Sequence, residues 1–167
     1  MSGGYEIVLW ILLIVASATD LLWGKIYNHL TFSSIAIGVV TRLVLQGMPS
    51  STTSLTAIAA AFLFFFPLYY LKTLAAGDVK LLMAVGAWSD TELVIHLGLT
   101  AIFMGAIVGL IILLNKKGLQ KTLSSIFTAL KFESKKESQM TRMPFAPAFL
   151  CSFLFLKIAE FKGWSLF

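Results

Sequence analysis

Two aspartates, Asp20 and Asp78, are the residues of this sequence that are best placed to do chemistry. Asp20 closes one strongly apolar run and Asp78 opens another. Placing a carboxylate at membrane depth costs free energy, so such a residue is by default expected to have a function. Two carboxyl groups within about 3 Å of each other cannot both ionise, so they share a proton and act jointly as acid and base. Such a pair predicts hydrolysis of a peptide bond by water, with the acid and base roles belonging to the pair as a unit.

The elements that must position these aspartates are predicted to be membrane-spanning helices. Hydrophobic residues make up 58% of the sequence and charged residues 13%, whereas a soluble domain is about 25% charged. Helices are expected because lipid offers no partner for an unpaired backbone group, and the apolar runs lack the alternation of a membrane barrel. The predicted fold is therefore an all-α polytopic membrane protein with about six transmembrane helices, forming one membrane-embedded domain over residues 1–167.

The predicted spans are Tyr5–Leu22, Thr31–Leu45, Leu55–Leu71, Val79–Trp88, Leu93–Leu114 and Phe145–Phe161. The fourth span is short. Gln46–Ser51 is rich in turn-forming residues and is predicted to be a turn outside the hydrocarbon.

Basic residues predict how the helices are oriented, since short cytoplasmic loops carry the excess of lysine and arginine. Lys25 lies in the first loop, Lys72 and Lys80 flank the third, and seven basic residues crowd the fifth. We therefore expect a multi-pass protein of the inner or cytoplasmic membrane with both termini external. Asp20 and Asp78 are then expected at the same cytoplasmic face.

The long polar segment at about residues 115–143 has two possible interpretations. Apolar residues recur there at helical spacing with lysines between them, which is typical of a basic amphipathic helix on anionic lipid. A solvated cytoplasmic loop explains the same charges equally well. In both cases membrane topology explains the net charge of +5 better than binding to nucleic acid.

Several residues near the aspartates have both a functional and a structural interpretation. Gly77 allows a substrate backbone or a neighbouring helix to approach closely. Lys80 could bias the carboxyl pair electrostatically or simply reach for the membrane interface. Asn28 and Thr31 could place the substrate backbone, or they could cap the second span.

No metal or other cofactor is expected. His29 and His96 are isolated from other ligands, and Cys151, the single cysteine, lies inside an apolar run. Met143–Pro147 is typical of a rigid entry into the last span, because proline is tolerated in the first turn of a helix.

With these residues in view, the sequence resembles the prepilin peptidases, and in particular their short Tad-type branch that processes Flp-pilus subunits. The matching stretches occur in the family's order over essentially the whole chain and are Thr19–Asp20, Lys25–Thr31, Ala76–Leu81 and Pro144–Ala148. The resemblance implies a GxGD-type intramembrane aspartyl endopeptidase that cuts class III leader peptides from type IV pilin-like precursors at the cytoplasmic face. It implies catalytic roles for Asp20 and Asp78, and substrate-binding or site-supporting roles for Gly77, Lys80, Asn28, Lys25 and Pro144.

The sequence departs from the family's pattern at two positions. The usual Gly-x-Gly-Asp reads Ala75-Ala76-Gly77-Asp78, and the common proline before Asn28 is Tyr27. Neither change removes an ionisable group, so substrate specificity or local geometry is affected more than the chemistry. The short N-terminal segment and the single cysteine predict no N-methylating activity.

Two other classes of protein remain open from the sequence. A small proton-coupled transporter also uses membrane carboxylates, although usually near the bilayer midplane and within repeated halves. A noncatalytic pilus assembly factor could retain the same scaffold. Cleavage of a prepilin-like peptide separates the peptidase from both.

Overall fold

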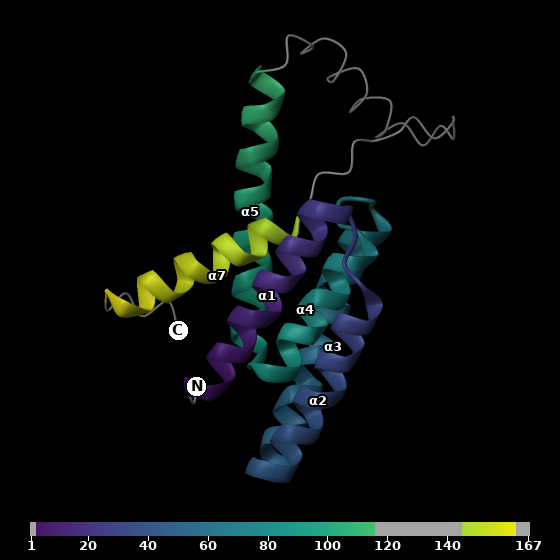
Figure 1. The fold of residues 1–167 in the computed structure, drawn as a ribbon, viewed down its shortest axis with the longest axis vertical. Helices are drawn as coiled ribbons and strands as arrows, with labels where there is room; N and C mark the ends of the chain where they lie inside the picture. The colour runs from purple at the N-terminus through teal and green to yellow at the C-terminus, as the bar shows by residue number, and fades with distance from the viewer. Residues whose placement is uncertain (1–2, 116–144, 163–167) are drawn as a thin grey trace.

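The computed structural model describes residues 3–115 and 145–162, and these residues are almost entirely helical (Figure 1). The helices are α1 (Gly3–Trp23), α2 (Asn28–Gln46), α3 (Met48–Tyr70), α4 (Ala76–Trp88), α5 (Thr91–Asn115) and α7 (Ala146–Phe161). Each predicted span corresponds to one helix, so the all-α prediction is confirmed. The polar segment predicted at about 115–143 lies outside the described residues beyond Asn115.

The chain does break within Gln46–Ser51, but the prediction of a turn over all six residues is wrong. Only Gly47 separates α2 from α3, and its φ of 80° is a conformation that a residue without a side chain adopts easily. Pro49 lies in the first turn of α3, where its missing N–H group costs nothing. The hydroxyl groups of Thr52 and Thr53 donate hydrogen bonds to the Pro49 carbonyl at 2.7 and 3.0 Å. The polar residues therefore begin a helix instead of forming a loop.

The predicted capping role of Asn28 is also wrong. Tyr27 occupies the N-cap position of α2, where no side chain makes a capping hydrogen bond, and Asn28 is the first helical residue. The Thr31 hydroxyl donates to the Asn28 carbonyl at 3.1 Å, which is a bond within the helix. The Asn28 side chain is thereby left available for a contact outside α2.

Helix α4 occupies the centre of one half of the molecule. It packs mainly against α2 and α3, and in Figure 1 these three helices run side by side. Nine of its 13 residues are buried. Because it is surrounded by other helices, α4 needs no polar face, and its sequence after Lys80 is apolar all round.

Helix α7 packs against α1 in the opposite chain direction and also against α5. The Trp10 and Phe153 rings meet edge to face with centroids 4.8 Å apart near the middle of the α1–α7 pair. Lys157 donates to Glu6 at 2.7 Å near the first turns of α1. These contacts align the start of α7 with the last turn of α1.

Helices α1, α2 and α3 are long and apolar enough to cross a membrane. Large apolar side chains on α2 and α3 point away from the rest of the protein, including Val44 and Leu63, which are 73% and 71% exposed. Exposed apolar surface on this scale is typical of a protein that contacts lipid. Helices α4 and α7, with 13 and 16 residues, are shorter than the roughly 20 residues of a full span.

Candidate active site

Asp20 lies in the last turn of α1 and is 9% exposed. Its Oδ2 atom accepts a hydrogen bond from the backbone N–H of Ala146, the first residue of α7, at 3.0 Å. The first N–H groups of a helix have no partner within the helix and form its positive end. The carboxylate therefore anchors α7 to α1 across 126 residues of sequence.

Asp78 is the third residue of α4 and is 3% exposed. Its Oδ2 atom accepts a hydrogen bond from the N–H of Ala75 at 3.0 Å, and its own N–H donates to the Ala75 carbonyl at 3.0 Å. An acidic residue at this position closes the first turn of a helix. Ala75 has no side-chain acceptor, so only the half of this cap that Asp78 supplies is present.

Asp20 and Asp78 lie at the same end of the helix bundle, which we call the aspartate end. It contains the last turn of α1 and the first turns of α2, α4 and α7. The structure thus brings together two buried carboxyl groups that are 58 residues apart in sequence.

Gly77 provides a close contact between α4 and the connection from α1 to α2. A Cβ atom at this position would lie 3.3 Å from Cβ of Ile26, which is tighter than an ordinary van der Waals contact. The absence of a side chain lets the 24–27 connection approach the first turn of α4. Gly77 therefore has a packing role beside the two aspartates.

Lys80 and Asn28, two of the predicted site-supporting residues, are brought together by the fold. Lys80 Nζ donates to Asn28 Oδ1 at 2.9 Å and lies 5.3 Å from the centre of the Phe32 ring. The pair joins the first turns of α2 and α4 at the protein surface. Lys25 is exposed in the connection before α2. Pro144 lies outside the described residues.

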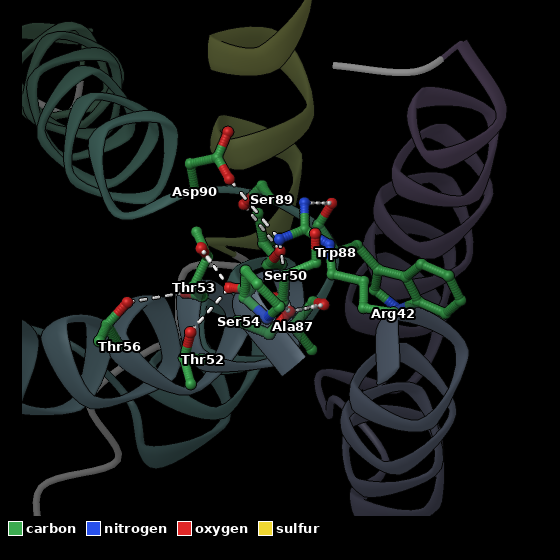
Figure 2. Close-up of polar contacts among 12 residues, drawn as sticks. Arg42, Ser50, Thr52, Thr53, Ser54, Thr56, Ala87, Trp88, Ser89 and Asp90 are labelled. Carbon is green, nitrogen blue, oxygen red and sulfur yellow. Dashed lines mark hydrogen bonds and ion pairs between the residues drawn. The ribbon is translucent and has the colours of Figure 1, made fainter. Parts of the chain in front are cut away.

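Arg42 is the principal residue that sequence reasoning missed. It is only 5% exposed, near the end of the bundle opposite the aspartates, and it bonds to α3 and α4 (Figure 2). The available signal was an arginine inside the apolar run 31–45, which is unusual enough to mark a site. The second missed feature is the Ala146 N–H group, which no side-chain pattern reveals.

In the part of the chain that the structure describes, no three histidine, cysteine, aspartate or glutamate side chains are grouped so that they could hold a metal ion. His29 and His96 are separate from each other in sequence and lie on α2 and α5. The ionisable side chains at the aspartate end are those of Asp20 and Asp78, of His29 in the first turn of α2, and of Lys25, Lys72 and Lys80.

The helical bundle and the site together define a class of membrane protein, in which two buried carboxyl groups lie at one end of a bundle of apolar helices. The chain matches the model of the type IV leader peptidase family over residues 7–110, which is well over half of its length, and it therefore belongs to this family. The match includes both aspartates, Gly77 and Lys80, and ends before α7. Comparisons with curated proteins and with solved structures gave no match.

Proposed function

We propose that this protein is an aspartic endopeptidase that cleaves class III leader peptides from Flp-type, type IV pilin-like precursors. Membership of a leader peptidase family supports peptidase activity. The observation that supports the aspartic mechanism is the placement of Asp20 and Asp78, both buried, at one end of the bundle.

In the proposed reaction, the ionised carboxylate of the pair removes a proton from a water molecule as its oxygen attacks the carbonyl carbon of the scissile peptide bond. The protonated partner stabilises the oxyanion by donating a hydrogen bond. Breakdown of the tetrahedral intermediate breaks the C–N bond, and the leaving amine takes a proton from the pair. The two residues exchange acid and base roles, so neither role belongs to one aspartate alone.

We place the aspartate end at the cytoplasmic face of the inner or cytoplasmic membrane. Lys25 lies in the connection just beyond Asp20, and Lys72 follows α3 at the same end. Positive charge favours the cytoplasmic side, which leaves both termini external if all six described helices cross the bilayer. The short helices α4 and α7 would cross only a locally thinned bilayer.

The proposed substrate is a membrane precursor with a short basic leader followed by an apolar helix. A cleavage site at the cytoplasmic face lies where such a helix leaves the hydrocarbon. The basic segment at about 115–143 is proposed to contact anionic lipid on the same side. No N-methylation is included in this proposal.

The test is cleavage of a co-expressed Flp-type precursor, followed by the same assay with purified protein and a prepilin-like peptide. Asp20→Asn and Asp78→Asn are each expected to abolish cleavage while helical content is retained. Glu92→Gln is the matched control, because Glu92 is an exposed acidic residue in the first turn of α5. Cleavage that persists in either aspartate variant would contradict the proposal.

One observation favours a noncatalytic assembly factor as the second candidate. Each aspartate accepts a backbone hydrogen bond, Asp20 from Ala146 and Asp78 from Ala75, as purely structural carboxylates do. In that case the wild-type protein would not cleave any prepilin-like peptide, and the asparagine variants would differ from it in stability alone.

A further inference from the structure

The C-terminal end of α4 is buried, and its carbonyl groups need partners. Trp88 is the last residue of the helix and is 6% exposed, and Ser89 after it is fully buried. The last four carbonyl groups of any helix lack partners within the helix, and leaving them unpaired in the interior is costly. Ser89 donates to two of them, from its hydroxyl to the Val85 carbonyl at 2.8 Å and from its N–H to the Gly86 carbonyl at 3.4 Å. The carbonyls of Ala87 and Trp88 therefore depend on side chains from neighbouring helices.

Arg42 of α2 and Ser54 of α3 supply these partners. Arg42 Nη2 donates to the Trp88 carbonyl at 3.1 Å, and Ser54 Oγ donates to the Ala87 carbonyl at 3.0 Å. Arg42 Nη1 also donates to Ser54 Oγ at 3.3 Å, so the two side chains form one network, shown in Figure 2. A cation at a helix C-terminus also complements the helix dipole.

The charge of Arg42 has further partners around it. Asp90, which precedes α5, lies 3.6 Å from Nη1 and is half exposed, and the centre of the Tyr5 ring of α1 lies 5.4 Å from the guanidinium carbon. A buried charge whose partner is removed destabilises the surrounding structure strongly. Arg42 therefore fixes the end of α4 relative to α1, α2, α3 and the start of α5.

The same helix carries Asp78 at its other end. The rise from Asp78 to Trp88 is about 15 Å over ten residues of helix. Helix α4 is short, packed on most sides and free of internal proline, so a displacement of its last turn moves its first turn as well. An error of about 1 Å in an active site can lower a reaction rate by roughly a hundredfold.

We propose that Arg42 is a positioning residue. It sets the position of α4 along its own axis within the bundle, and thereby the position of Asp78 relative to Asp20. Its influence on cleavage rests on the proposed peptidase function, whereas its influence on α4 does not. Side-chain contacts hold α4 at both ends. Arg42 and Ser54 bind the Trp88 and Ala87 carbonyls at its C-terminal end, and the Lys80–Asn28 pair joins its N-terminal part to α2.

The test compares Arg42→Met with Lys157→Met, which removes a cation near the same end of the bundle without touching α4. Lys157 instead pairs with Glu6 and Glu160. Full-length protein in lipid nanodiscs is assayed for kcat and KM, and for hydrogen–deuterium exchange along α4. Arg42→Met is expected to lower kcat about tenfold or more with little change in KM, and to raise exchange selectively over residues 75–90. Lys157→Met is expected to leave exchange over residues 75–90 unchanged, because its contacts join α1 and α7 and not α4.

Two milder variants keep the test decisive if Arg42→Met does not fold. Arg42→Lys keeps the charge but loses the forked geometry, and Ser54→Ala removes the hydroxyl that holds Ala87. Both are expected to show smaller effects in the same direction. Wild-type kcat together with wild-type exchange over residues 75–90 in these variants would overturn the proposal.

The exchange measurement also separates this inference from the proposed function. If the wild-type protein cleaves no prepilin-like peptide, the peptidase assignment fails, but exchange over α4 still decides whether Arg42 holds this helix. If cleavage depends on both aspartates while Arg42→Met leaves kcat and exchange unchanged, the peptidase assignment stands and the positioning role is refuted.

Discussion

Replacing Gly86 with alanine is predicted to force α3 and α4 apart. A Cβ atom at position 86 would lie 3.0 Å from the carbonyl carbon of Ala57 and 3.1 Å from both its oxygen and the amide nitrogen of Ile58. Carbon atoms pack best at about 3.5–4.0 Å, so the helices would have to separate by roughly half an ångström. The clashing atoms belong to the backbone of α3, and no side-chain rotation can relieve the contact.

Two opposing effects determine the free energy of unfolding of this variant. Alanine in place of glycine inside a helix raises the free energy of unfolding by about 1 kcal/mol, because its helix propensity is higher. Overpacking a close contact lowers the free energy of unfolding by about 1–3 kcal/mol. Backbone cannot yield as a flexible side chain can, which favours the upper part of that range. We therefore expect Gly86→Ala to lower the free energy of unfolding by about 1–2 kcal/mol.

The assay is thermal or denaturant unfolding of purified protein in one detergent, with helical circular dichroism as the signal. Gly4→Ala is the matched control, because no atom lies within 4 Å of the position that its Cβ would take. The control is expected to be neutral or slightly stabilising, since it gains helix propensity without a clash. A Gly86→Ala protein as stable as the Gly4→Ala protein would refute the close approach of α3 and α4.

Two further predictions concern the aspartate end. Asp20→Ala leaves the Ala146 N–H group without its acceptor and is expected to lower the free energy of unfolding by about 1–3 kcal/mol. Asp20→Asn retains an acceptor oxygen, so its free energy of unfolding should fall much less. Equal stability of the two variants in denaturant unfolding would contradict the hydrogen bond. A double-mutant cycle with Lys80→Met and Asn28→Ala should give a coupling energy of about 0.5–1 kcal/mol, since the pair lies at the surface. A coupling of zero would show that the contact does not stabilise the protein.

Sequence alone determined the helical architecture and the two residues of greatest interest. Six apolar runs became six helices in the described residues, because their composition leaves backbone hydrogen bonding within each segment as the main way to satisfy polar groups. Asp20 and Asp78 could be chosen because a carboxylate beside a long apolar run has an obvious cost. Both are indeed buried.

Helix boundaries were less predictable where local signals compete. Gly47 and the polar residues after it are equally compatible with a loop and with a helix start that includes proline in its first turn. Whether the chain turns at one residue or over six depends on how closely α2 and α3 pack, which only the folded protein decides.

Only the tertiary structure determined what each buried polar group contacts. The Asp20 carboxylate meets the Ala146 N–H group 126 residues later, and Arg42 meets the Trp88 carbonyl 46 residues later. Backbone groups look the same at every position of a sequence, so composition and spacing cannot tell which one becomes the partner. Helix packing makes that choice, and for this protein it sets the two aspartates together at one end and holds α4 from the other.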